Sequence, residues 1–301
     1  MNNPPLLPSK RERIIIFLSW TLIVLLSTVP DILFSEITGK VPSWLVYGKM
    51  GLSLAAILAA IVFKPIRPLW RLGVIMIAYY GFNLLRPQFD FTRPWLQKLF
   101  GATAFDVRMQ AEQIGKLAMT LAMIAVMLLV GLKRHDFFLV AGGLRNNIRP
   151  VKLLGFPKAE PWPKFGLIYG FGIAIVLGIV QYLQLRPDGS LFIKVLPMLP
   201  SVIFYAALNS FNEEMFLRAP IIAVTEPHSG TLNAMWMSAF FFGIAHYFGV
   251  PGGLFGALAS IFMGWILSKA MVETRGLFWP FIIHILSDIV IFAFIAMSLV
   301  K

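Results

Sequence analysis

The sequence predicts an all-α fold, a polytopic transmembrane helical bundle. Its mean hydropathy is +0.78, and only 13% of its 301 residues are charged, which is too apolar for the surface of a soluble globular protein. Apolar runs also recur at the length of about 17 to 25 residues that a helix needs to cross a bilayer. These observations exclude a soluble enzyme and indicate a chain that lies within a lipid bilayer.

The apolar runs give nine candidate spans. They lie at roughly 14–34, 45–63, 71–85, 112–132, 165–185, 195–222, 231–248, 252–270 and 276–299. The third run is short and follows Arg71, so the alternative is a re-entrant or tilted segment there and eight spans in total. The first run follows Lys10, Arg11 and Arg13 without a small-residue cleavage site, so we expect it to remain as an anchor.

The positive charge is explained by the membrane. The formal net charge is +12, but Lys and Arg cluster just outside the apolar runs, as the positive-inside rule and anionic headgroups require. No basic stripe or aromatic platform accompanies the charge, so we expect no nucleic-acid partner. Most basic residues fall on inner segments when the N-terminus is cytoplasmic, which favours that orientation in the plasma (inner) membrane. Cysteine is absent, which excludes disulfides and thiolate chemistry.

Composition divides the chain into four expected parts. These are a basic cytoplasmic N-terminal tail at 1–13, N-terminal transmembrane helices at 14–132, a cytoplasmic connector at 133–164 and a transmembrane core at 165–301. The connector is rich in glycine and proline, which interrupt helices. In the core, Gly252, Gly256, Ser260 and Gly264 recur every four residues, and this smooth stripe predicts close packing against a neighbouring helix.

Ionisable side chains in the late spans are the candidates for chemistry, because each is costly in a bilayer unless it is paired or hydrated. They form three motifs on the sixth, seventh and ninth spans: Glu213, Glu214 and Arg218; Phe242 and His246; His284 and Asp288. Each residue alone could be a structural hydrogen bond between helices. For the whole set, we favour one active site buried among the late helices.

The acidic motif predicts unequal roles for its two glutamates. Glu214 and Arg218 are four residues apart and share a helix face, so they can form an ion pair. Glu213 points about 100° further round the helix and is left to face a cavity. Pro220 follows closely and should kink the helix just after the motif.

The histidine motifs also pair residues four apart. His284 and Asp288 can meet on one face, where the carboxylate would orient the imidazole, and Phe242 can pack beside His246. The other two histidines, His135 and His228, fall in expected loops, and we interpret both as solvated surface residues.

The motifs Glu-Glu-x-x-x-Arg, Phe-x-x-x-His and His-x-x-x-Asp, in this order on three late spans, resemble the CPBP family. That family includes the type II CAAX prenyl endopeptidases and Abi-like bacteriocin-processing or self-immunity membrane proteins. The resemblance covers roughly 165–301 and reaches back to Gly142 and Gly143. It implies an intramembrane endopeptidase that acts on a membrane-associated peptide or protein.

The resemblance also implies roles for the site residues. Glu213 would be the general base that activates water, Glu214 with Arg218 would hold the helix, and His246, His284 and Asp288 would complete the site, with Phe242 in support. Two mechanisms fit these residue types. In one, a Zn ion held by His246, His284 and Glu213 activates the water; in the other, Glu213 acts without a metal and the histidine motifs stabilise an oxyanion.

Two positions depart from the family pattern. Characterised prenyl-protein members often have Asn, a hydrogen-bond donor, where this chain has Asp288. An ionised carboxylate would repel an oxyanion, so we assign Asp288 to orienting His284 or to a metal. Ala219 stands where many relatives have Gly, which is a minor change.

Other functions remain as alternatives. A non-proteolytic immunity or scaffold protein of the same fold would carry the same motifs, and a transporter or proton relay could use the same buried acids and histidines. No inverted repeat supports transport, and the chain lacks the sequence signatures of site-2, rhomboid and presenilin-like proteases.

Overall fold

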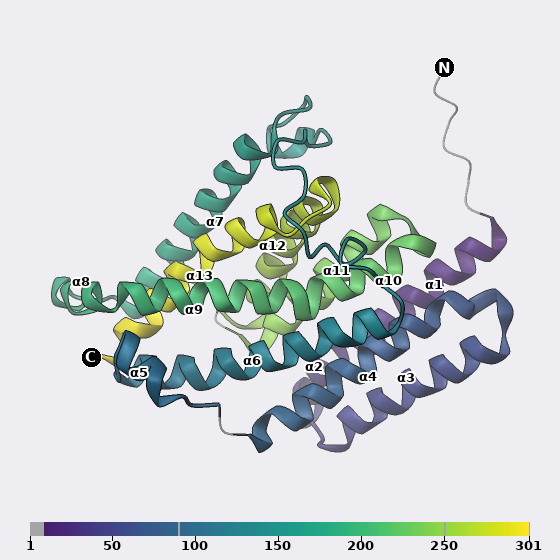
Figure 1. The fold of residues 1–301 in the computed structure, drawn as a ribbon, viewed down its shortest axis with the longest axis horizontal. Helices are drawn as coiled ribbons and strands as arrows, with labels where there is room; N and C mark the ends of the chain where they lie inside the picture. Colours follow the sequence, from purple (N-terminus) through teal and green to yellow (C-terminus); the bar gives the residue numbers. More distant parts are fainter. Residues whose placement is uncertain (1–8, 90, 250, 301) are drawn as a thin grey trace. The chain divides into compact units, whose positions relative to one another are not determined.

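The computed structural model describes residues 9–89, 91–249 and 251–300 (Figure 1). They form two compact units, each assembled from separate stretches of the sequence. Unit 1 contains Met1–Gly81, Val126–Lys133 and Leu217–Ser268, and unit 2 contains Phe82–Ala125, Arg134–Phe216 and Lys269–Lys301. Most of the tail expected at 1–13 lies outside the described residues, and the predicted domain boundaries stay a prediction.

The helices of unit 1 come from both ends of the sequence. They are α1 (Lys10–Leu25), α2 (Val29–Thr38), α3 (Trp44–Val62), the 3-10 helix η1 (Lys64–Leu69), most of α4 (Trp70–Leu85), α10 (Ala219–Ser229), α11 (Thr231–Ile244), the 3-10 helix η6 (Ala245–Phe248) and most of α12 (Gly253–Thr274).

The helices of unit 2 come mainly from the middle and the end of the chain. They are η2 (Arg86–Gln88), α5 (Pro94–Phe100), most of α6 (Ala104–Leu129), η3 (Lys152–Leu154), α7 (Trp162–Leu185), α8 (Gly189–Val195), η4 (Leu196–Met198), α9 (Leu199–Glu213) and α13 (Phe278–Leu299). A π-helical turn, η5 (Glu214–Arg218), continues the chain from α9 to α10.

The all-α fold class is confirmed. Across the described ranges, the β-type pairings are two isolated bridges, Asn147 with Pro161 and Val151 with Phe156, both inside the predicted connector. Six helices there are long and apolar enough to span a membrane, or seven if the bent pair α1 and α2 is one span. This count is below the predicted eight or nine. α11 has 14 residues and rises only about 21 Å, against a hydrocarbon core of about 30 Å.

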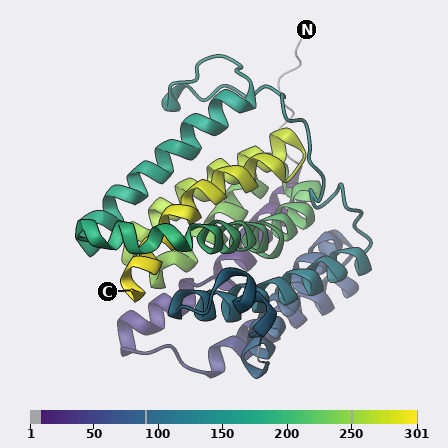
Figure 2. The same cartoon turned by 60° about the vertical axis from the view of Figure 1, so that its left-hand side comes forward.

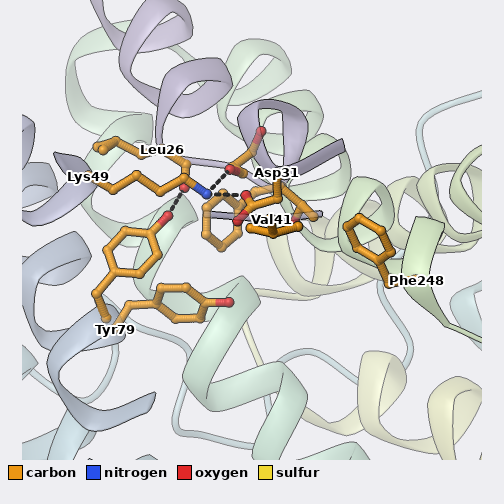
Figure 3. A pocket seen from close by; sticks show the side chains of 10 residues that line it. Leu26, Asp31, Val41, Lys49, Tyr79 and Phe248 are labelled. Carbon is orange, nitrogen blue, oxygen red and sulfur yellow. Dashed lines mark hydrogen bonds and ion pairs between the residues drawn. The ribbon is translucent and has the colours of Figure 1, made fainter. Parts of the chain in front are cut away.

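The first predicted span is broken rather than continuous. α1 and α2 meet at an angle of 44°, and Pro30 near the start of α2 cannot donate a backbone hydrogen bond to Leu26. Two side chains take over the freed carbonyls: the Tyr80 hydroxyl donates to Leu26 O, and Lys49 Nζ donates to Ser27 O at 2.7 Å. Lys49 also pairs with Asp31, beside a pocket of about 240 Å³ in unit 1 (Figure 3).

The small-residue stripe lets two helices of unit 1 approach closely. A Cβ on Gly264 would lie 3.2 Å from the Ala239 backbone, and a Cβ on Gly243 would overlap the backbone of Ile261. α11 and α12 therefore pack at backbone contact, as the stripe predicted.

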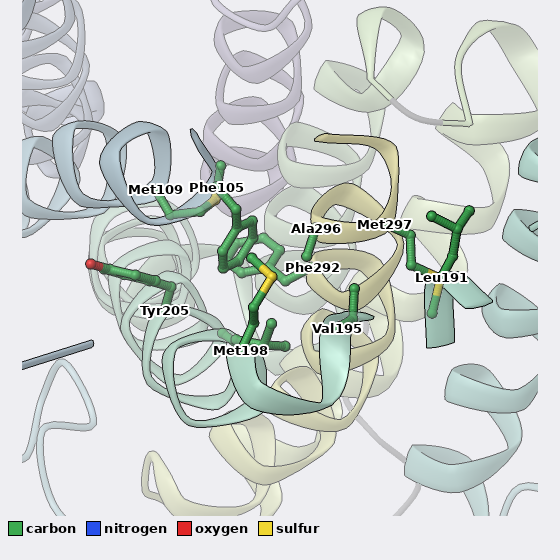
Figure 4. Close-up of a cluster of buried hydrophobic side chains, with 11 residues drawn as sticks. Phe105, Met109, Leu191, Val195, Met198, Tyr205, Phe292, Ala296 and Met297 are labelled. Carbon is green, nitrogen blue, oxygen red and sulfur yellow. The ribbon is translucent and has the colours of Figure 1, made fainter. Parts of the chain in front are cut away.

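Unit 2 is built around α13. α7 and α13 run side by side in both views, and α9 also packs on α13 (Figure 1, Figure 2). An apolar cluster of α6, α8, α9 and α13 side chains, including Phe105, Tyr205 and Phe292, fills the region beside α13 (Figure 4). The position of α13 matters for the site because it carries the third motif.

The predicted connector is irregular and is anchored to the turn between α12 and α13. Gly143 N donates to Thr274 O at 2.7 Å, Leu277 N donates to Val140 O at 2.8 Å, and Trp279 Nε1 donates to Leu144 O at 2.8 Å. Gly142 has φ +79° and a Cβ there would meet Thr274 O and Gly276, so only glycine fits this contact. The connector therefore fixes the start of α13.

Candidate functional site

The acidic motif lies at an irregular turn of its helix. Glu213 ends α9, and Glu214–Arg218 form the π-helical turn η5. Pro220 explains it: the residue has no N–H and its ring excludes the Phe216 carbonyl four residues earlier, so the backbone widens just before the proline. The sequence predicted a kink just after the motif, whereas the structure shows a π-turn within it. Such turns are frequent at functional sites.

Unit 2 brings both glutamates to the third motif. His284 Nδ1 lies 2.8 Å from Glu214 Oε1, and Nε2 lies 3.5 Å from Glu213 Oε2 and 3.7 Å from Asp288 Oδ2. The imidazole therefore stands among three carboxylates. Its short contact is with Glu214, whereas the sequence assigned the orienting role to Asp288.

The two glutamates differ in exposure as well as in partners. The side chain of Glu214 is 0% exposed and that of His284 is 3% exposed, whereas 18% of Glu213 is accessible. Glu213 is therefore partly accessible at the surface of the described structure, and Glu214 is not. The predicted roles of the two glutamates, one facing a cavity and one holding the helix, stay a prediction.

Asp288 is held by donors from α9. Its Oδ2 accepts from Asn209 Nδ2 and from Ser210 Oγ, both at 3.0 Å. Two neutral donors on one oxygen offset the cost of burying this carboxylate. The assignment of Asp288 to orienting His284 stays a prediction.

A lysine that the motifs do not include also reaches the cluster. Lys116 Nζ, on α6, lies 2.7 Å from Asn209 Oδ1, 3.2 Å from Glu213 Oε1 and 3.4 Å from Glu112 Oε1. Lys116 and Glu112 stand at the start of the predicted fourth span, four residues apart. The sequence feature that marks this pair is the presence of two charged residues inside an apolar run, and the motifs do not include it.

Arg218 is buried within unit 1. It donates from Nη1 to Gly264 O at 3.0 Å and to Ser268 Oγ at 3.3 Å, and its guanidinium lies 4.5 Å from the centre of the Phe242 ring. The expected ion pair between Arg218 and Glu214 stays a prediction.

His246 lies in η6 of unit 1. Its ring packs against Phe242 with centroids 4.7 Å apart, as the spacing predicted, and its Nδ1 lies 3.0 Å from the Phe242 carbonyl oxygen. If Nδ1 donates this bond, Nε2 is left as the ring nitrogen that can accept a proton.

The remaining histidines are not alike. His135 is exposed, as expected. His228 lies in the last turn of α10, is half-buried, and its Nε2 is 3.1 Å from Ser19 Oγ. The interpretation of His228 as a solvated loop residue is therefore wrong, because α10 extends to Ser229.

The polar groups around the cluster do not resemble a zinc site. Across the part of the chain that the structure describes, no group of three or more His, Asp or Glu side chains could hold a metal ion. Glu213 contacts the Lys116 ammonium, and Asp288 accepts hydrogen bonds from two neutral donors. Both carboxylates therefore already have hydrogen-bond donors. The predicted zinc set of His246, His284 and Glu213 stays a prediction.

The comparisons agree with the motifs. Residues 195–290 match the family model described as type II CAAX prenyl endopeptidase, Rce1-like. This segment holds every predicted site residue, from Glu213 to Asp288. No curated protein and no solved structure matches the chain. With its apolar spans, the chain is an integral membrane protein, and residues 195–290 carry a domain of the CAAX endopeptidase and CPBP family of membrane proteases, as the three motifs predicted.

Proposed function

We propose that this chain is an intramembrane peptidase that hydrolyses a peptide bond of a membrane-associated protein or peptide, with Glu213 as general base. One observation carries the proposal: Glu213 is the accessible carboxylate of a cluster whose other acids are buried, and its Oε2 lies 3.5 Å from His284 Nε2. Both atoms can contact one water molecule or one substrate oxygen.

The chemistry is metal-free in this proposal. Glu213 takes a proton from water as the water oxygen bonds to the substrate carbonyl carbon, and the carbonyl oxygen becomes an oxyanion. The C–N bond then breaks, and the proton held by Glu213 passes to the leaving nitrogen. A proton on His284 Nε2 would face the oxyanion, while Nδ1 is fixed by Glu214.

The other motif residues support these steps. Asp288 orients the His284 ring. Glu214 with Arg218 holds the π-turn that follows Glu213 and so fixes the position of that glutamate. His246 enters the proposal through its motif alone, as a second group that stabilises the oxyanion, and Phe242 packs against its ring. The N-terminus is cytoplasmic and the membrane is the plasma (inner) membrane in this proposal.

The test is proteolysis by purified protein in detergent or nanodiscs. Two peptide libraries should be compared, one with prenylated C-terminal CAAX sequences and one with unmodified membrane peptides. Cleavage should fall by at least about 10²-fold in Glu213→Gln, because the isosteric amide cannot take a proton from water. If both Glu213→Gln and His284→Ala cleaved like the native protein, the catalytic assignment would be wrong and the immunity, scaffold or transport functions would take its place.

The same assay decides between the two mechanisms. We expect cleavage to persist in a strong chelator, and the metal content of active protein to be the same in native protein and in His284→Ala. Loss of activity on chelation, with recovery on adding Zn and about one equivalent of metal per chain, would establish the zinc mechanism instead.

A further inference from the structure

Lys116 stands at the candidate catalytic cluster but belongs to none of its motifs. It lies on α6, outside the family match at 195–290. Its ammonium touches Asn209, Glu213 and Glu112, and 25% of its side chain is exposed. A charged lysine at this depth in an apolar helix needs a compensating partner, and each of these contacts supplies an acceptor.

The geometry separates the two oxygens of Glu213. Lys116 contacts Oε1, whereas Oε2 faces His284 Nε2. A carboxylate held by one oxygen cannot rotate freely about its last bond, so the other oxygen keeps a fixed direction. That oxygen is the one that would take the proton from water.

Lys116 is also linked to Asp288 through the side chain of Asn209. Lysine can only donate hydrogen bonds, so the amide must turn its oxygen toward Lys116, and its NH2 group then donates to Asp288. The orientation of one amide therefore couples the lysine to the third motif. Loss of the ammonium would free both Glu213 and Asn209.

Glu112 is the other carboxylate at the same ammonium. It lies one helical turn before Lys116 at 3.4 Å, and 37% of its side chain is exposed, against 18% for Glu213. Exposed pairs are screened by water, so the contact with Glu213 is the stronger of the two. The ammonium has three N–H donors, so it can contact Asn209, Glu213 and Glu112 together.

We propose that Lys116 is a positioning residue for the catalytic glutamate: it holds Oε1 of Glu213 and the Asn209 amide, so that Oε2 faces the reacting water. This inference rests on the proposed peptidase function. It assigns a role to a helix that the family match does not include.

The experiment compares Lys116→Met with Lys116→Arg in the full-length protein. Lys116→Met should lower kcat by about 10- to 100-fold, the loss expected when a reacting group is misplaced, and leave KM within about twofold. Lys116→Arg keeps the charge and should recover most of the kcat. Lys49→Met is the matched control: it removes a lysine from the Asp31 pair of unit 1 and should lower Tm while kcat of the folded protein stays within about twofold.

A thermal-shift cycle tests the contact without using activity. Adding Lys116→Met to Glu213→Gln should lower Tm much less than adding it to the native protein, because the carboxylate that the lysine compensates is already gone. Additive Tm changes would overturn the proposal. If Lys116→Met does not fold, Glu112→Gln serves instead: Asn209 and Glu213 still hold the ammonium, so kcat should stay within about twofold, and a tenfold loss would overturn the proposal.

Failure of the proposed function is distinguishable from failure of this inference. Native kcat in Lys116→Met together with a dead Glu213→Gln overturns the positioning role and leaves the peptidase intact. Full activity in Glu213→Gln overturns both.

Discussion

At the scale of single residues, two adjacent glutamates occupy opposite environments. Glu213 is partly open to solvent beside a lysine, and Glu214 is fully buried against His284. Adjacent positions on a helix point in different directions, so neighbouring acids in a sequence need not share a function. The more exposed acid is the one to which we assign proton transfer.

Glu214→Gln should therefore affect stability more than chemistry. Removing a buried charge from its partners costs on the order of 3 to 5 kcal/mol, so we expect a large fall in Tm and in expression. The sequence also pairs Glu214 with Arg218, so the double change Glu214→Gln with Arg218→Met should recover part of the loss, because no unpaired cation then remains. Tm of the two single variants and the double variant measures this, and strictly additive losses would refute the predicted ion pair.

Spacing along one helix predicted only the local part of the cluster. It placed His284 beside Asp288 and Phe242 beside His246, both four residues apart. It could not find the contact of His284 with Glu214, 70 residues away, or that of Lys116 with Glu213, 97 residues away. Such contacts depend on which helices become neighbours, and helical periodicity carries no information about that.

At the scale of elements, breaks in helices are where polar side chains gather. The π-turn before Pro220 presents the acidic motif, and the break before Pro30 exposes carbonyls that Tyr80 and Lys49 satisfy. In an apolar surrounding, each freed carbonyl needs a donor. Both prolines were visible in the sequence, but at Pro30 the compensating donors, Tyr80 and Lys49, come from other helices.

Tyr80→Phe tests this compensation at the first break. The change removes only the hydroxyl that bonds Leu26 O, and Tyr80 is buried. An unsatisfied buried carbonyl costs about 1 to 3 kcal/mol, so Tm should fall clearly. Tyr182→Phe is the control, because that ring is 49% exposed and loss of its hydroxyl should leave Tm nearly unchanged. Equal Tm values for the two variants would contradict the capping role of Tyr80.

At the scale of the whole molecule, composition was sufficient for the fold class and insufficient for its organisation. Hydropathy located α3, α7, α12 and α13 to within a few residues, since burial in lipid leaves an unbroken apolar run. It missed the start of α6, which begins at Ala104 and not at 112. Fewer helices than predicted have the length of a span, because α4 and α11 are apolar but short, with 16 and 14 residues. Hydropathy also gave no sign that each compact unit combines distant stretches of the chain.

The distribution of basic residues predicts the orientation of the chain in the membrane. The connector holds Lys133, Arg134, Arg145, Arg149, Lys152, Lys158 and Lys164, and short loops rich in Lys and Arg stay in the cytoplasm. Positions 147 and 189 are both exposed and lie on opposite sides of α7, a candidate span.

Because the chain has no cysteine, Asn147→Cys and Gly189→Cys each create a single thiol. An impermeant maleimide should label position 189 in intact cells, and position 147 only after the membrane is opened. Normal Tm and cleavage by both variants would show that the substitutions are harmless. Labelling of position 147 from outside, with position 189 protected, would reverse the orientation and would place the connector, with the α12–α13 turn that it holds, outside the cell.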